Sequence, residues 1–263
     1  MSDPAVVLDD LREESEELDV LVRELSEERW GAPTPAPGWT IAHQIAHLAW
    51  TDRAALLAAT DPEAFAVETE KALAAPDRFV DEGAEEGAKL PPAELLAAWR
   101  AGRERLQEAL RAVPPGARFP WYGPPMSAPA MATARLMETW AHAQDVADAL
   151  GAVRTPTARL RHVAWIGVRA RDYAYLVRGS IPAPAEPFRV ELTSPDGETW
   201  VYGPEGAAQT VTGPALDFCL LVTQRVHRDD TALVAHGPDA ERWLGIAQAF
   251  AGPAGAGRAP EGA

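Results

Sequence analysis

The sequence predicts a mainly α-helical protein, with a helical bundle over residues 1–152 and a smaller α+β domain over residues 153–252. Three observations lead to this fold class. Apolar residues recur at helical spacing in successive segments of the first half of the chain. Stretches rich in proline and glycine separate these segments. Alternation of apolar and polar residues, which is typical of a strand, is first convincing after residue 187.

The first predicted helix spans about residues 4–29, where apolar residues follow an approximate helical stripe. It ends before the segment GAPTPAPGWT, whose three prolines and two glycines do not continue a helix. Thr40 closes that segment and offers a hydroxyl as the cap of a second helix, over residues 41–60. An Asp-Pro start then predicts a third, weaker helix over residues 61–87.

A proline start and a period near 3.6 predict a fourth helix over residues 90–113. A long loop follows at residues 114–129, rich in proline, glycine and aromatic residues. Ser127 or Thr133 then leads into a helix that stops at Gly151, a residue suited to a left-handed cap. These segments together predict an up-and-down bundle.

The remainder of the chain has a different pattern. One more helix is expected over residues 159–179, and a β-hairpin around the turn PDG is expected over residues 188–203. Two further helices are predicted over residues 213–226 and 237–250. The tail at residues 253–263 consists mainly of glycine, alanine and proline, so we expect it to be disordered.

Composition and charge exclude several classes of partner. The chain has 39 acidic and 24 basic side chains and a formal charge of −15, which disfavours nucleic acid and anionic membranes. The single cysteine, Cys219, excludes an intramolecular disulfide, and the acidic N-terminus lacks a secretory signal pattern. No apolar run approaches the roughly 20 residues that cross a bilayer. We therefore expect a cytoplasmic monomer or homodimer that acts on a small molecule.

Two predicted helices each carry polar residues at a spacing of four. Glu138 and His142 lie on one face of an otherwise apolar helix, and so do His43 and His47 on another. Glu138 and His142 either form a simple intrahelical pair or share a third partner. If the two helices face each other, two or three imidazoles and one carboxylate are the donors that a catalytic zinc or similar ion accepts, with a place left for water.

The segments PGWTIAHQIAHLAW and MATARLMETWAHAQDVADALG resemble the DinB-like superfamily, in the actinobacterial branch that includes mycothiol-dependent maleylpyruvate isomerase. The resemblance extends to the segment at residues 214–253, which is similar to the C-terminal domain of that branch. It implies a four-helix bundle in which His47, Glu138 and His142 hold a divalent ion, and it leaves His43 outside this triad.

The resemblance also implies a chemistry. The ion would be zinc, or nickel as the alternative, and its open positions would hold water or the thiolate of a low-molecular-weight thiol such as mycothiol. In the isomerase that thiolate adds to a conjugated cis double bond, rotation follows, and elimination gives the trans product. The resemblance supports the site more strongly than the substrate.

Other side chains near these stripes are candidates for supporting roles. His43, in the first turn after Thr40, is expected in a local hydrogen bond, with a role beside the ligands as the alternative. Asp145 lies three residues after His142 and could accept its second ring proton. Arg135 lies three residues before Glu138 and could bind a substrate carboxylate. Ordinary salt bridges at the rim of the bundle remain the alternative for Asp145 and Arg135.

Substrate contacts are also predicted outside the ligand helices. Trp121 and Tyr122 lie in the aromatic loop before the second ligand helix, and a core position is the alternative for each. Arg225 belongs to a small basic cluster with His227 and Arg228, which could hold an anionic thiol or a carboxylate. We favour the alternative that this cluster is a solvated helix end.

The sequence therefore predicts a divalent-metal-dependent enzyme, a thiol-dependent isomerase or transferase acting on a small organic substrate. Two alternatives stay open. One is metal-dependent catalysis without a thiol, such as hydrolysis or cyclisation in secondary metabolism. The other is a non-catalytic protein that binds a metal or a ligand.

Overall fold

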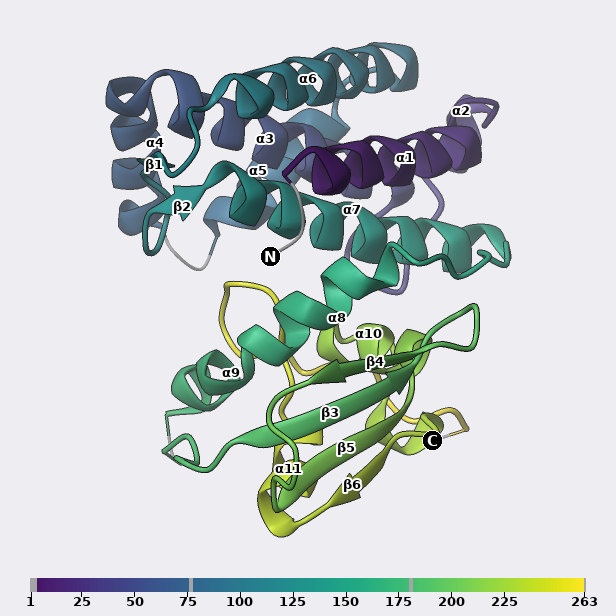
Figure 1. Cartoon of the computed structure of the whole chain (residues 1–263). Coiled ribbons are helices and arrows are strands. Elements are labelled where there is room, and N and C mark those ends of the chain that lie inside the picture. The colour runs from purple at the N-terminus through teal and green to yellow at the C-terminus, as the bar shows by residue number, and fades with distance from the viewer. Residues whose placement is uncertain (1–3, 76–77, 180–181, 263) are drawn as a thin grey trace. The chain divides into compact units, whose positions relative to one another are not determined.

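The computed structural model describes residues 4–75, 78–179 and 182–262. The chain forms two compact units, Met1–Arg154 and Thr155–Ala263. Figure 1 shows that helices make up most of the first unit and that the second contains a sheet. The domain limits expected from the sequence, 1–152, 153–252 and 253–263, stay predictions.

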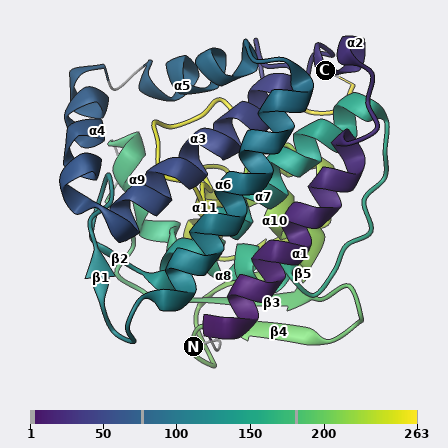
Figure 2. The same ribbon diagram turned by 90° about the horizontal axis from the view of Figure 1, so that it is seen from above.

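Long helices form the first unit. Helix α3 packs against α6 and α7, and α1 packs against α7, so the four lie side by side (Figure 2). Their bounds are α1 Pro4–Val22, α3 Ile41–Thr60, α6 Pro92–Ala112 and α7 Ala128–Leu150. Their apolar faces meet in a core that includes Leu18, Val22, Ile41, Ile45, Leu48, Leu95, Trp99 and Val146. Burial of these faces holds the bundle together.

The first predicted helix is interrupted. Helix α1 ends at Val22, and a short helix α2 occupies Glu27–Trp30. Ser26 precedes α2 in an extended conformation, with φ −66° and ψ 156°, and two glutamates follow it in the first turn. A serine followed by acidic residues is typical of a helix start, and here that local preference ends the long stripe expected from periodicity.

The third predicted helix is two helices, α4 over Pro62–Ala74 and α5 over Phe79–Ala88. Ala75 precedes a proline in the sequence and has φ −143° and ψ 57°, a non-helical conformation. A proline disfavours the helical conformation of the residue before it, which accounts for the break. Helix α5 packs along α3.

The loop before α7 contains a short antiparallel ladder between β1 (Arg118–Phe119) and β2 (Met126–Ser127). The Ser127 hydroxyl then accepts a hydrogen bond from the backbone N–H of Ala130 at 3.4 Å, which caps α7. Helix α7 ends at Gly151, whose φ of 65° lies in the left-handed region that glycine adopts without a steric penalty.

The second unit contains a four-stranded sheet of order β4-β3-β5-β6. Strands β3 and β4 form an antiparallel hairpin, β5 runs parallel to β3, and β6 is antiparallel to β5. Phe188, Val190 and Leu192 of β3 are buried, so one face of the sheet is covered. The strands are β3 Phe188–Thr193, β4 Thr199–Tyr202, β5 Gln209–Pro214 and β6 Val234–His236.

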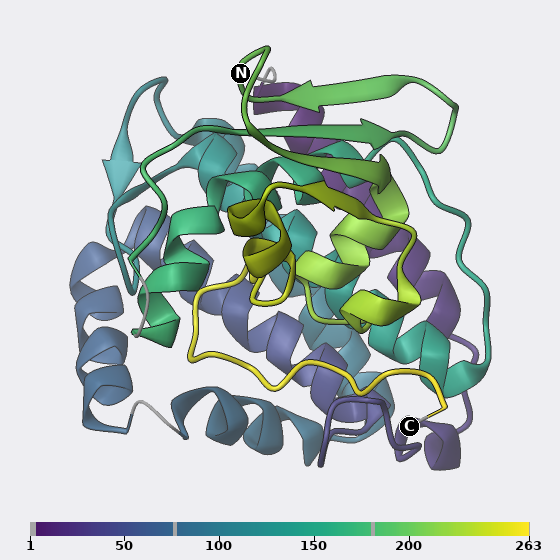
Figure 3. The ribbon, with the colours of Figure 1, turned by 90° about the horizontal axis from the view of Figure 1, so that it is seen from below.

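Short helices accompany this sheet. Helices α10 and α11 pack against its strands and lie on the same side of it (Figure 3). A single helix is expected over residues 159–179, but the structure has two, α8 and α9. The bounds are α8 Leu160–Arg169, α9 Arg171–Arg178, α10 Ala215–Val222, the 3-10 helix η1 Arg228–Asp230 and α11 Pro238–Leu244.

The tail of the chain, over its described residues 253–262, forms neither helix nor strand. The Arg178 guanidinium donates to the carbonyl of Gly255, and the backbone N–H of Glu261 donates to Asp230. The expectation that this tail is disordered stays a prediction. Among the residues that the structure describes, no helix has both the length and the apolar character needed to span a membrane.

Candidate metal centre

The bundle brings His47 of α3 together with Glu138 and His142 of α7. One ligand atom of each residue lies within 4.8 Å of the others. The Glu138 Oε2 atom lies 3.4 Å from His47 Nε2 and 3.3 Å from His142 Nε2. The centroids of the two imidazole rings are 4.6 Å apart. The two residues expected on one stripe of α7 thus share a third partner, which comes from the neighbouring helix.

The pairing follows from the antiparallel course of α3 and α7. His142 contacts Gln44, Glu138 contacts His47, and Arg135 contacts Asp52, so residue numbers rise along one helix as they fall along the other. The three α7 residues are three and four positions apart and lie on one helical face, so these contacts form a polar row in an otherwise apolar interface. Hydrogen bonds within the row offset the cost of burying its polar groups.

The cluster is mostly shielded from water. His47 is 7% exposed and His142 is 8% exposed, whereas the Glu138 side chain is 23% exposed. Burial alone would raise the pKa of Glu138, but hydrogen bonds from the rings of His142 and His47 hold it well below its usual range. The carboxylate therefore stays ionised at neutral pH and faces the accessible side of the cluster.

The three donors fit a divalent ion. Two imidazole nitrogens and one carboxylate oxygen are a ligand set of catalytic zinc sites. Ligand atoms held about 2.0 to 2.1 Å from a tetrahedral ion stand roughly 3.3 to 3.4 Å from one another. The distances from Glu138 Oε2 to the two Nε2 atoms, 3.4 and 3.3 Å, match that separation.

The loop between α2 and α3 covers the imidazoles with Trp39. Its ring lies 5.3 Å from that of His47 and is stacked on that of His142 at 5.9 Å with an interplanar angle of 17°. The Trp39 indole N–H donates to Asp81 of α5 at 3.1 Å. This residue was not among the candidates from the sequence, because its contact with the histidines depends on how the loop folds back.

His43 has other partners than the cluster. Its Nδ1 lies 2.8 Å from the hydroxyl of Thr40 and accepts from the Thr40 backbone N–H, so the ring takes part in a capping box. Its Nε2 lies 2.9 Å from Glu85 of α5, and this hydrogen bond lowers the pKa of Glu85. Both ring nitrogens are thus engaged away from the ligand trio.

Arg135 and Asp52 form a buried ion pair at the end of the polar row. The Arg135 Nε atom donates to Asp52 Oδ1 at 2.9 Å, and the two side chains are 3% and 7% exposed. Burial raises the pKa of Asp52, although the charge of Arg135 acts in the opposite direction. Within the described part of the chain, Arg135 Nη2 is buried and has no hydrogen-bond partner. Asp145, on the same helix, is buried at 2% exposure.

A row of aromatic rings links the loop before α7 to the cluster. The Tyr122 ring lies 4.9 Å from that of Trp121 and 5.6 Å from that of Phe79. Phe79 lies 4.9 Å from Trp50, which lies 6.0 Å from His47. Burial raises the pKa of Tyr122 to about 12, so its hydroxyl keeps its proton at neutral pH. Trp121 and Tyr122, which the sequence predicts as substrate contacts, thus belong to an aromatic wall that reaches His47.

The basic cluster predicted in the second unit is bound to its own neighbours. Arg225 donates to the carbonyl of Thr223 at 2.6 Å. His227 Nδ1 accepts from the backbone N–H of Asp229, and Arg228 donates to Thr231 at 3.1 Å. These contacts belong to the turn after α10 and to η1.

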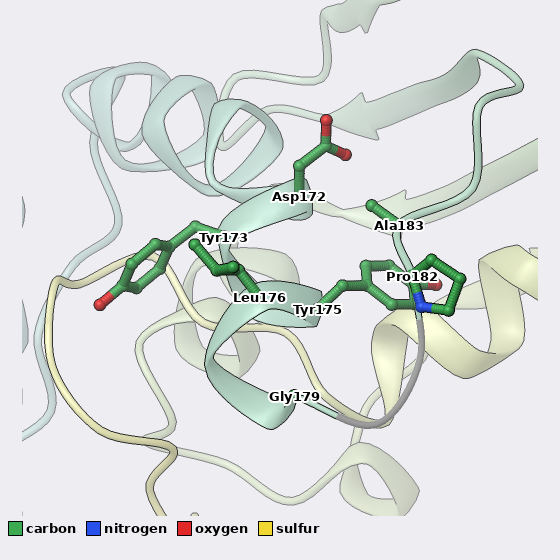
Figure 4. A pocket seen from close by; sticks show the side chains of 7 residues that line it. All are labelled: Asp172, Tyr173, Tyr175, Leu176, Gly179, Pro182 and Ala183. Atoms are coloured by element: carbon green, nitrogen blue, oxygen red, sulfur yellow. The ribbon is translucent and has the colours of Figure 1, made fainter.

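The second unit also has an open hollow of about 700 Å³ beside α9 (Figure 4). Tyr173, Tyr175 and Leu176 contribute to its lining together with Asp172. The Tyr173 hydroxyl donates to the carbonyl of Gly252 and the Tyr175 hydroxyl donates to that of Asp239. Both phenols are therefore occupied by backbone contacts, and the described lining offers no donor set comparable with that of the bundle.

Comparison with known proteins gives matches for both units. The sequence model described as mycothiol maleylpyruvate isomerase N-terminal domain matches residues 11–147, and the one described as wyosine base formation matches residues 184–236. Two uncharacterized proteins of Mycobacterium tuberculosis, from two strains, are each 60% identical over 258 residues, which cover 98% of this chain and 100% of the relative.

Two solved structures share the fold. They are described as the crystal structure of the mycothiol-dependent maleylpyruvate isomerase and that of a histidine-to-alanine mutant of it. The TM-scores are 0.60 and 0.59 at 19% and 18% sequence identity, and the matches cover 89% of this chain and 93% of each solved chain. The predicted fold class, mainly α with a smaller α+β part, is confirmed.

Proposed function

The chain belongs to the family of the mycothiol maleylpyruvate isomerase N-terminal domain, in the DinB-like superfamily, and from this we propose a divalent-metal-dependent enzyme. It performs a thiol-dependent isomerisation or transfer on a small organic substrate, with mycothiol as the thiol. The observation that carries the proposal is the trio of His47, Glu138 and His142, with Oε2 to Nε2 distances of 3.4 and 3.3 Å. The relatives described as mycothiol-dependent isomerases supply the class of reaction.

The three side chains would hold zinc, or nickel as the alternative. When bound, such an ion lowers the pKa of a thiol that reaches it, so that the thiol is a nucleophile at neutral pH. Glu138 contributes a carboxylate that is already ionised, because hydrogen bonds from the two rings lower its pKa. The Glu138 side chain is 23% exposed, so the substrate would approach the site from the side of this carboxylate.

Other residues of the bundle would orient the substrate. Trp39 and Trp50 lie against the imidazoles, and Trp121 and Tyr122, at the far end of the aromatic wall, are kept as candidates for substrate contacts. Arg135 is the candidate for a substrate carboxylate, since its Nη2 has no partner in the described structure. Arg225 is kept as a candidate for an anionic group. Asp145 is kept as a candidate beside His142, although the Nδ1 atom of that ring is hydrogen-bonded to Gln44.

The cytoplasm is the location that we propose, since a chain with one cysteine forms no internal disulfide and so fits a reducing compartment. A monomer or a homodimer would act there on a small molecule.

Elemental analysis of protein purified without a polyhistidine tag or a chelator tests the metal. We expect about one metal ion per chain in the wild type and loss of that ion in Glu138→Ala, His47→Ala and His142→Ala. His43→Ala is the matched control, because its ring binds Thr40 and Glu85 instead, and it should keep the ion. Full retention of metal in His47→Ala or His142→Ala would contradict the ligand set.

Cobalt substitution tests the thiol. Addition of mycothiol to the cobalt protein should produce a sulfur-to-cobalt charge-transfer band, because the thiolate coordinates directly. A protein that holds cobalt and gives no such band would be a metal enzyme without a thiol or a non-catalytic binding protein. A wild type without stoichiometric metal would reduce the trio to a buried ion pair.

A further inference from the structure

A chain of hydrogen bonds leads from the ligand His142 to the loop that precedes α3. The Nδ1 atom of His142 is hydrogen-bonded to Gln44 Oε1. The side-chain amide of Gln44 donates to the hydroxyl of Thr34 at 2.9 Å. That hydroxyl donates in turn to the backbone carbonyl of Trp39 at 2.9 Å. Gln44 is fully buried, so no solvent competes with these contacts.

The hydrogen bond from Thr34 to the carbonyl of Trp39 sets the direction of the other two. A backbone carbonyl only accepts, so the single proton of the Thr34 hydroxyl points to Trp39. The hydroxyl oxygen must then accept from Gln44, which places the amide NH₂ group toward Thr34. The amide oxygen of Gln44 consequently faces His142. Because that oxygen is an acceptor only, the Nδ1 atom of His142 carries a proton.

We infer that Thr34 and Gln44 are positioning residues that hold a proton on Nδ1 of His142 and fix the orientation of its ring, so that Nε2 is the nitrogen turned toward Glu138 and left for an ion. A histidine binds an ion through a ring nitrogen that carries no proton, and Nδ1 is engaged by Gln44, so Nε2 is the nitrogen that an ion would take. That atom lies 3.3 Å from Glu138 Oε2, in the ligand trio. This inference rests on the proposed metal site and adds to it the groups that set the donor atom.

His47 is the internal contrast. Its Nε2 also faces Glu138, but its Nδ1 is buried without a hydrogen-bond partner in the described part of the chain. The ring nitrogen that faces away from Glu138 is thus held by a hydrogen bond in His142, whereas in His47 it has no such bond within the described residues. Hydrogen bonds to the outer nitrogen orient a metal-bound histidine and raise its basicity, and their loss typically costs about 10- to 100-fold in metal affinity.

Two matched pairs of variants test the inference. Thr34→Val removes the hydroxyl that orients the amide, whereas Thr34→Ser keeps it. Gln44→Leu removes the acceptor for Nδ1, whereas Gln44→Glu keeps an oxygen acceptor there. Thermal unfolding of the metal-free variants shows whether each one is folded, and only folded variants are compared.

The first readout is zinc affinity, measured by competition with a chelator. We expect about a 10- to 100-fold loss in Gln44→Leu and a smaller loss in Thr34→Val, with Thr34→Ser close to the wild type. Gln44→Glu should bind zinc at least as well as the wild type, because its carboxylate also accepts from Nδ1. Equal affinities in all folded variants would overturn the inference, provided that the wild type binds zinc.

The second readout needs no metal. Long-range ¹H–¹⁵N spectra of the metal-free protein, at about pH 8, show whether Nδ1 of His142 carries a proton. We expect a protonated Nδ1 in the wild type and in Thr34→Ser, and loss of that proton in Gln44→Leu. A bare Nδ1 in the wild type would overturn the inference. If the wild type fails to bind zinc, the proposed function fails, while this spectrum still decides the role of Thr34 and Gln44.

Discussion

Glu138 joins the two imidazoles through one carboxylate oxygen, and its ionisation links the cluster to the stability of the protein. Its pKa is well below the usual range in the folded state. A carboxyl group of this kind contributes stability above its unfolded pKa, which is about 4.3, and that contribution is lost as the pH falls toward the folded value. Each unit of lowering corresponds to about 1.4 kcal/mol.

The metal-free wild type should therefore lose more free energy of unfolding between about pH 5 and pH 3 than Glu138→Gln, which has no carboxyl group to protonate. Chemical denaturation in the presence of a chelator at several pH values measures this difference. Glu85→Gln is the matched control, since Glu85 also pairs with a histidine but is 59% exposed, and its effect on the slope should be smaller. Identical acid slopes for the wild type and Glu138→Gln would contradict the assignment.

The buried pair of Asp52 and Arg135 gives a second prediction at this scale. Asp52→Asn removes the charge that faces Arg135, whose side chain is 3% exposed, and leaves a buried cation without its counter-charge. Loss of one partner of a buried pair costs roughly 3 to 5 kcal/mol. Chemical denaturation should show a loss of this order, and the double variant Asp52→Leu with Arg135→Met should recover most of it. A loss below about 1 kcal/mol, typical of exposed pairs, would show that the pair is solvated.

The residues of the site differ in how far the sequence could predict them. The spacing of four between Glu138 and His142 places them on one helical face. Spacing alone did not separate His47 from His43, and that choice came from the resemblance to a family. Gln44 lies three residues before His47 in an apolar stretch, a signal that was available. Thr34 gives no such signal, because its contact depends on the path of a loop.

At the scale of the elements, α5 lies against α3 through two glycines. A Cβ atom at Gly87 would lie 2.8 Å from the Cβ of Ala46, and one at Gly83 would lie 2.9 Å from the Trp50 ring. The contacts of Asp81 with Trp39 and of Glu85 with His43 also come from this helix. Close approach of α5 to α3 therefore positions the α5 side chains that contact Trp39 and His43.

Substitution of Gly87 by alanine should destabilise the protein, although alanine favours a helix by about 1 kcal/mol over glycine, because the added methyl group meets Ala46. Gly102→Ala is the matched control. Gly102 is also helical, a Cβ atom there has nothing within 4 Å, and the change should stabilise by about 0.5 to 1 kcal/mol. Denaturant midpoints of both variants measure this. Equal stabilisation by the two alanines would mean that α5 does not pack closely on α3.

The elements that the sequence predicted well are those with strong local signals. The helix expected over residues 41–60 occurs as α3, Ile41–Thr60, and the turn PDG joins β3 to β4. Strands β5 and β6 were missed. Strand β6 has only three residues, and β5 pairs in parallel with β3, a partner that local alternation does not reveal. The break between α4 and α5 was missed because periodicity continues on both sides of it.

At the scale of the whole molecule, an ion at the proposed site would connect two helices that are far apart in sequence, α3 through His47 and α7 through Glu138 and His142. A ligand that binds only the folded state stabilises it by RT ln(1 + [L]/Kd), about 2.7 kcal/mol at 100 times Kd. Chelation should therefore lower the temperature at which the bundle unfolds. For a domain of this size each kcal/mol corresponds to about 2 to 4 °C.

Scanning calorimetry of the full chain, with zinc and with a chelator, measures the effect. The bundle transition should move down by roughly 5 to 10 °C on chelation when zinc is at 100 times Kd. If the second unit unfolds in a separate transition, the temperature of that transition should not change, because the three candidate ligands all belong to Met1–Arg154. Glu138→Ala should unfold at the same temperature in both buffers. If chelation leaves the wild type unchanged as well, no ion bridges α3 and α7, and the three side chains form only a hydrogen-bonded cluster between helices that their apolar faces hold together.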